Sequence, residues 1–151
     1  MDSGSVRVRL MRADDFDAIV GIDARVLKVP RLEYYRLKFE KFIQSKDYVP
    51  TSLVAEDDDG TVVGFIMGEL YIGEFGISEA ATLDTIGVDP SHQYKGIGQK
   101  LIHEYVEHLR SLGIKKMNTL VDENDSRLIH FFKANKFIPS KIVSLERSIE
   151  S

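Results

Sequence analysis

Apolar residues follow two different spacings along the chain, and the change from one to the other predicts a mixed order of strands and helices. Alternating or short continuous apolar runs are typical of strands. Apolar residues three and four apart are typical of helices with one buried face. On this basis strands are predicted at Val6–Leu10, Ser52–Ala55, Thr61–Tyr71, Ala80–Val88, Met117–Val121 and Ile142–Leu145.

Four amphipathic helices are predicted between these strands. They run over Asp14–Leu27, Pro30–Ile43, Ile97–Leu112 and a segment that follows the capping residues of Asp122–Ser126 and ends near Asn135. The strand–helix–strand unit over residues 80–121 should contain a parallel pair, because a helix can return the chain to the same end of the sheet. The pattern therefore predicts a mixed α/β fold.

The chain has 151 residues, which predicts a single domain over 1–151 with room for a hydrophobic core. Its composition, 29% charged and 43% hydrophobic, is that of a soluble globular protein. The net charge of −4 disfavours a nucleic-acid partner. Residues 1–75 hold 10 Lys/Arg and 14 Asp/Glu while the rest hold 10 of each, so the acidity lies in the first half.

The chain contains no cysteine, which excludes disulfides, thiolate metal sites and a cysteine nucleophile. The sequence shows neither the pattern of a secretory signal nor an apolar run near the ~18 residues of a membrane span. We therefore expect a cytoplasmic protein without a membrane partner.

Glycine takes the place of a normal helix cap after the strand that ends Ile86-Gly87-Val88. The loop that follows contains Lys95, Gly96 and Gly98 at the expected start of a helix. Helix starts expose unpaired N–H groups and usually follow Ser, Thr, Asp or Asn. Without such a residue, the loop predicts that an anion from outside the chain, most simply a phosphate, binds there.

Two common phosphate loops fit poorly. A P-loop requires a Gly followed by Lys and Ser/Thr, which is absent from this chain. A dinucleotide loop requires a third glycine where Leu101 stands, although Asp122 falls near the place of its ribose-binding carboxylate. The connection from Asp89 to Lys95 is also longer than the tight turn of that fold, so this alternative ranks lower.

The third possibility is the pattern Q-x-x-G-x-G, which is matched by Gln93–Gly98. The strand and Asp-Pro turn at Ile86–Pro90 come before it, and Phe132–Phe137 comes later and is similar to a "YEKLGF"-like helix end. In these segments and in its element order the chain resembles the GNAT superfamily of acetyl-CoA-dependent N-acetyltransferases. The resemblance implies a twisted mixed sheet of about six or seven strands with about four helices on both faces.

The resemblance also implies acetyl-CoA as co-substrate, with no metal. Backbone N–H groups of the loop would bind the pyrophosphate, and the end of the preceding strand would pair with the pantetheine arm. Gly87 would fit a bulge that makes room for that arm. The implied contacts are Ile86, Gly87, Val88, Gln93, Tyr94, Lys95, Gly96, Ile97, Gly98, Gln99, Asn124 and Asp125.

Asp84 is the candidate catalytic base, because relatives commonly carry a carboxylate on this strand. Regular alternation would place Asp84 on the same face as Thr82 and Ile86. A carboxylate within an apolar strand needs a partner or a function, so Asp84 is either the base or amine-binding group, or a structural partner. Glu69 and Glu74 are weaker alternatives.

The chain departs from the family at the position of the proton donor for the thiolate. Phe132 stands where relatives often have tyrosine, and phenylalanine has no proton to give. Water, Tyr34 or Tyr35 could protonate the thiolate, or the thiol could leave without help. Asp125 likewise stands where relatives often have an asparagine, and Asn124 beside it could replace that contact.

Metal binding is disfavoured. His103 and His108 are five residues apart and diverge on a helix, so they do not have the usual spacing of zinc ligands. The acidic run Glu56–Gly60 is typical of an Asp-Gly hairpin turn and lacks the ligand spacing of a calcium loop.

The leading hypothesis is a transferase that moves acetyl from acetyl-CoA to a primary amine by direct attack. The amine could belong to a protein N-terminus, a lysine or a small cationic molecule. A coenzyme A-binding module without catalysis is the alternative, and a nucleotide-binding protein is third. The sequence leaves open the length of the acyl group and the oligomeric state, with a homodimer as one option.

Overall fold

The computed structural model describes residues 6–44, 51–71 and 80–150, and the chain divides into two compact units, 1–120 and 121–151. In the first unit the strands are β1 (Arg7–Leu10), β2 (Leu53–Glu56), β3 (Val62–Tyr71), β4 (Ala80–Val88) and β5 (Lys116–Thr119). The helices are α1 (Phe16–Leu27), α2 (Leu32–Gln44) and α3 (Ile97–Ser111), with short 3-10 helices η2 (Ala13–Asp15) and η4 (Pro90–His92).

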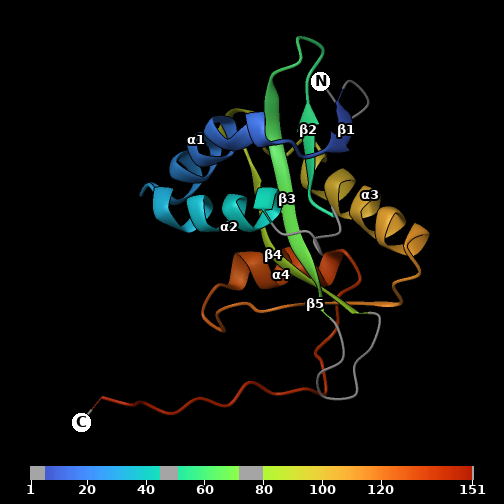
Figure 1. The fold of residues 1–151 in the computed structure, drawn as a ribbon. Coiled ribbons are helices and arrows are strands. Elements are labelled where there is room, and N and C mark those ends of the chain that lie inside the picture. Colours follow the sequence, from blue (N-terminus) through green and yellow to red (C-terminus); the bar gives the residue numbers. More distant parts are fainter. Residues whose placement is uncertain (1–5, 45–50, 72–79, 151) are drawn as a thin grey trace. The chain divides into compact units, whose positions relative to one another are not determined.

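The described residues form one mixed sheet of five strands in the order β1-β2-β3-β4-β5 (Figure 1). The first four strands pair antiparallel, and β4 pairs parallel with β5. This confirms the mixed α/β fold and the parallel pair predicted over 80–121. The sheet has fewer strands than the six or seven implied by the family resemblance.

Helices cover both faces of this sheet. Phe65 and Met67 of β3 share a buried cluster with Ile22 of α1 and Tyr35 of α2. On the opposite face, a Cβ at Gly64 would meet Leu101 of α3. Strand residues alternate between faces, so α1 and α2 pack on one side of β3 and α3 packs on the other (Figure 1).

One extra residue interrupts the pairing of β3 with β4. Met67 pairs with Thr85 and Gly68 pairs with Leu83, which leaves Asp84 without a partner residue on β3. This is a β-bulge, and it changes which side chains point to each face. Thr82 and Asp84 share a face, as expected, and this face is turned towards α2, but Ile86 lies opposite Ile66 and faces α3. The prediction that these three residues share one face was wrong for Ile86.

Gly87 has a different role from the one expected. It pairs with Phe65 in the regular part of the ladder, and the bulge lies three residues earlier. A Cβ at Gly87 would stand 2.7 Å from the Phe65 ring. Glycine is therefore required here by the close approach of an aromatic side chain.

In the second unit, α4 (Ser126–Ala134) begins at Asp125, whose carboxylate accepts a hydrogen bond from the Leu128 N–H at 3.1 Å. The rings of Phe131 and Phe137 pack against Phe132 at centroid distances of 5.5 and 4.9 Å.

The strand predicted at Ile142–Leu145 is absent. Residues 138–150 have no regular secondary structure. Val143 and Leu145 are 73% and 91% exposed, and the apolar alternation of this segment forms no strand within the described residues of the second unit.

Candidate functional site

The start of α3 has the uncapped form that the sequence predicts. Gly96 is the N-cap residue, with the left-handed backbone angles φ 80° and ψ 9°, and no side chain caps the helix. Tyr94 also has a positive φ of 64° and is 91% exposed. The first N–H groups of a helix have no partner within it, so those of this turn can bind an anion.

Side chains around this loop fix its shape. The Gln93 amide donates a hydrogen bond to the Val88 carbonyl at 3.1 Å. Asp89 accepts hydrogen bonds from Ser91 and pairs with Arg25 of α1 at 2.9 Å. Burial works to raise the pKa of Asp89, but the Ser91 N–H and the Arg25 guanidinium hold it below its usual value. These contacts hold the first part of the loop, from Asp89 to Gln93, in place.

The residues at the end of this loop and the start of α3 differ in how far they are exposed. Ile97 is 2% exposed and packs into the core, so only its backbone can meet a ligand. Lys95 and Gly98 are half-buried, and Gln99 is exposed on the first turn of α3. The prediction that this segment binds a coenzyme therefore depends on backbone N–H groups, with Lys95 as a nearby cation.

The second half of β4 is open along one side. Its parallel pairing with β5 covers only Ala80–Leu83, and Thr119 of β5 donates its hydroxyl to the Leu83 carbonyl at 2.9 Å. From Thr85 to Val88, β4 is paired with β3 alone among the described residues. The backbone of Ile86–Val88 is thus a sheet edge that leads towards the α3 loop.

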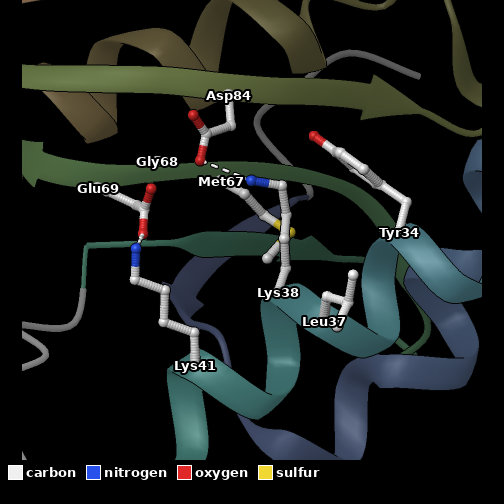
Figure 2. A pocket seen from close by; sticks show the side chains of 8 residues that line it. All are labelled: Tyr34, Leu37, Lys38, Lys41, Met67, Gly68, Glu69 and Asp84. Carbon is white, nitrogen blue, oxygen red and sulfur yellow. Dashed lines mark hydrogen bonds and ion pairs between the residues drawn. The ribbon is translucent and has the colours of Figure 1, made fainter. Parts of the chain in front are cut away.

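An open pocket of about 280 Å³ lies between α2 and strands β3 and β4 (Figure 2). Its lining residues are Tyr34, Leu37, Lys38, Lys41, Met67, Gly68, Glu69 and Asp84. The predicted base, Asp84, is therefore a pocket residue. Glu74 lies outside the described residues.

Two ion pairs join α2 to the strands in this pocket. Lys38 Nζ lies 2.8 Å from Oδ2 of Asp84, and Lys41 pairs with Glu69 (Figure 2). The side chains of Lys38 and Asp84 are only 21% and 17% exposed, whereas those of Lys41 and Glu69 are more exposed. Burial works to lower the pKa of Lys38, but the hydrogen bond to Asp84 and the negative charge of that carboxylate together raise it.

The two tyrosines weighed as acids have different surroundings. Tyr34 lines the pocket, with the Arg31 guanidinium and Lys38 Nζ at 4.4 and 5.0 Å from its ring centre. Tyr35 is fully buried and donates its hydroxyl to Asp23 at 2.8 Å. Burial raises the pKa of the Tyr35 phenol, which makes this residue a poor proton donor.

Tyr35 also connects the helices with the bulged strand. Asp23 of α1 accepts hydrogen bonds from both Tyr35 and Arg31, and the Tyr35 hydroxyl lies 3.5 Å from Oγ1 of Thr85. Thr85 follows Asp84 directly. This buried network therefore holds α1 and α2 at the point of β4 where the pocket carboxylate lies.

Sequence reasoning missed the lysines of this pocket. Lys38 and Lys41 lie on the polar side of the helix predicted over Pro30–Ile43, where a lysine is ordinarily a solvated charge. Two lysines spaced i, i+3 on the polar side of a helix share one face, which was the available signal. Their partners depend on how α2 docks on the sheet, and that cannot be read from a single helix.

Asn124 and Asp125 lie in the second unit. Asp125 caps α4, and the Asn124 N–H donates to Asp122 at 2.8 Å. Their role as coenzyme contacts stays a prediction.

Within the described residues no group of three or more His, Asp or Glu side chains is arranged to hold a metal ion. No helix among them has the length and apolar character needed to cross a membrane.

The sequence profile of the Acetyltransferase (GNAT) family matches residues 16–137, so the chain belongs to this family. A mycothiol acetyltransferase of Propionibacterium freudenreichii is 25% identical over 146 residues, which cover 87% of this chain and 43% of that protein. A mycothiol acetyltransferase of Saccharomonospora viridis is 24% identical over 135 residues, with coverage of 85% and 44%. The chain thus spans less than half the length of these two relatives.

Solved structures share the fold. The aminoglycoside N-acetyltransferase AAC(6')-Iy in complex with CoA matches with a TM-score of 0.77 and 19% identity, over 95% of each chain. The ribosomal-protein-S18-alanine N-acetyltransferase from Escherichia coli matches with a TM-score of 0.69 and 19% identity, over 85% of this chain and 75% of that one. Sequence identities this low support a common architecture and say nothing of the acceptor.

Proposed function

We propose that this chain is an acetyl-CoA-dependent N-acetyltransferase that acts on a primary amine. The observation that carries the proposal is the position of the glycine-capped start of α3 beside the open edge of β4. The start of α3 fits the pyrophosphate of coenzyme A, and the side of Ile86–Val88 that faces away from β3 fits the amides of the pantetheine arm. The contacts implied at Gln93–Gln99 and at Asn124 and Asp125 belong to this proposal.

The co-substrate supplies a thioester whose carbonyl carbon is open to attack by an amine. A backbone N–H near the end of β4 can donate a hydrogen bond to the carbonyl oxygen and so stabilise its developing negative charge. The amine nitrogen forms the new C–N bond, the C–S bond breaks, and one proton must pass from the amine to the departing thiolate or to solvent.

Asp84 is proposed to accept the amine proton or to hold the ammonium before it is lost. Its carboxylate lies in the pocket at the β4 bulge, next to the open edge. Lys38 occupies one oxygen of this carboxylate, so an entering amine must share Asp84 with Lys38 or displace it. Tyr34, rather than Tyr35, is the proposed proton donor among the tyrosines, because it lines the pocket.

The test is a thiol-release assay with acetyl-CoA and a panel of primary amines, combined with calorimetric titration of coenzyme A. Release of free thiol that depends on the amine supports the transferase. Tight coenzyme binding without turnover on any amine would instead identify a coenzyme-binding module. Binding of NAD without binding of coenzyme A would reject the proposed loop assignment.

A further inference from the structure

The charges that line the pocket are balanced in pairs. Two carboxylates, Asp84 and Glu69, come from the strands, and two lysines, Lys38 and Lys41, come from α2 (Figure 2). Each lysine is bound to one carboxylate. The pocket walls therefore carry no net charge, even though residues 1–75 have an excess of acidic residues.

This balance limits which amines can bind well. An ammonium that takes Asp84 leaves Lys38 as a half-buried cation without its partner, and such a charge is costly. A polycation would in addition meet the positive charges of both lysines at short range. A cationic amine without further groups thus gains one ion pair and loses another.

An amine that carries its own anion avoids this loss. Its ammonium can bind Asp84 while its anion binds the displaced Lys38, so that one internal ion pair is exchanged for two with the ligand. Building on the proposed function, we infer that the acceptor is zwitterionic, a primary amine that bears a carboxylate or phosphate group of its own, and that the Lys38–Asp84 pair selects it. Lys41 and Glu69 repeat the arrangement at the more exposed side of the pocket.

The experiment compares amino acids with their own carboxamides as acceptors. The α-, β- and γ-amino acids vary the distance between amine and anion, and each carboxamide keeps the amine but lacks the anion. Spermine serves as the polycation. Calorimetric binding is measured on the chain saturated with coenzyme A, and thiol release from acetyl-CoA is measured in parallel. At least one acid is expected to bind about tenfold more tightly than its carboxamide and than spermine, because it gains a hydrogen bond between charged groups.

Lys38→Met should remove most of that tenfold preference, because the anion loses its partner. Lys41→Met should have a smaller effect, since that lysine is more exposed. Lys133→Met on α4 is the control, because it removes the same charge at a residue that is not among the lining residues of the pocket. Circular dichroism and thermal unfolding identify any variant that fails to fold.

Equal binding of acids and carboxamides, tighter binding of spermine, or an unchanged preference in Lys38→Met would each overturn the inference. Failure of the proposed function has a different signature, which is acceptor binding without any release of thiol. Because binding alone reports on the acceptor class, the two outcomes are separable.

Discussion

Lys38 Nζ of α2 and Asp84 Oδ2 of β4 lie 2.8 Å apart, so the carboxylate proposed to receive a proton already holds an internal cation. The two groups come from elements 46 residues apart in the sequence. The pair also fixes α2 to the sheet at the bulge. Both the binding of an acceptor and the chemistry of the pocket therefore depend on how easily this pair opens.

Replacing Asp84 by asparagine should reduce the rate of thiol release by about 100-fold, the usual size of a lost general base. The pH dependence of kcat should also change, while the affinity for coenzyme A should stay the same, because the loop before α3 is untouched. Glu69→Gln is the matched control, since it removes a second pocket carboxylate that is more exposed. A wild-type rate and pH profile in Asp84→Asn would leave Asp84 with a structural role only.

Replacing Gly98 by aspartate should abolish coenzyme A binding in calorimetry. The new carboxylate would repel the pyrophosphate at the first turn of α3. Acidic residues in a first helical turn favour the helix, so the variant should fold normally. His103→Asp, on an exposed position of the same helix, adds an acidic residue away from the loop and should bind coenzyme A like the wild type. Unimpaired binding by Gly98→Asp would contradict the loop assignment.

Replacing Gly68 by alanine should destabilise the chain by about 3 kcal/mol in urea unfolding, at the upper end of typical overpacking. The Cβ of the new alanine would lie 2.0 Å from the Tyr105 hydroxyl and 2.3 Å from the Thr82 carbonyl oxygen. The carbonyl belongs to the backbone of β4, so it cannot move aside by a change of rotamer. Gly21→Ala is the contrasting variant. Gly21 lies in the middle of α1, and a Cβ there would meet only the end of the flexible Arg25 side chain. Because glycine within a helix costs about 0.5–1 kcal/mol relative to alanine, Gly21→Ala should raise the free energy of unfolding by that amount. Similar effects of the two substitutions would rule out steric contact as the cause.

The Arg9–Asp15 ion pair should make the stability depend on pH. Burial works to raise the pKa of Asp15, but hydrogen bonds from Arg9 and from the Arg12 N–H hold it below the usual 3.8. A carboxyl whose pKa is lowered by folding stabilises the folded state above its unfolded value, and this contribution disappears as the pH falls through the folded value.

Arg9→Met should therefore be less stable than the wild type at pH 7, and the difference should shrink below about pH 4. Urea unfolding at several pH values measures it. Arg36→Met is the control, since Arg36 pairs with exposed carboxylates on α2 alone. A deficit that stays constant down to pH 3 would show that the Arg9 stem, and not its charge, contributes the stability.

Local patterns predicted much of this fold. The strand at Ala80–Val88 and the helix that begins at Ile97 lie where the sequence placed them, because apolar periodicity and a glycine at the helix start are properties of single segments. The hairpin at Glu56–Gly60 is also confirmed, with Gly60 at φ 81° and its N–H on the Asp57 carbonyl.

Features that depend on partners far along the chain could not be predicted in the same way. The bulge at Asp84 exists only in the register of β4 against β3, and the Lys38–Asp84 pair exists only once α2 is docked. The strand expected at Ile142–Leu145 has the right alternation, but a strand also needs a neighbour to receive its hydrogen bonds. Apolar periodicity predicts the secondary structure that a segment can form, but it does not predict which other segment will pack or pair with it.

The ladder between β3 and β4 pairs Met67 with Thr85 and Gly68 with Leu83, so the sheet would be continuous if Asp84 were deleted. Asp84 is therefore the residue of β4 that the sheet itself does not require. A shortened strand could keep its register on both sides of the gap while losing the pocket carboxylate. The candidate proton acceptor is thus an extra residue in a ladder whose pairing is complete without it, and its link to the fold is the ion pair with Lys38 of α2.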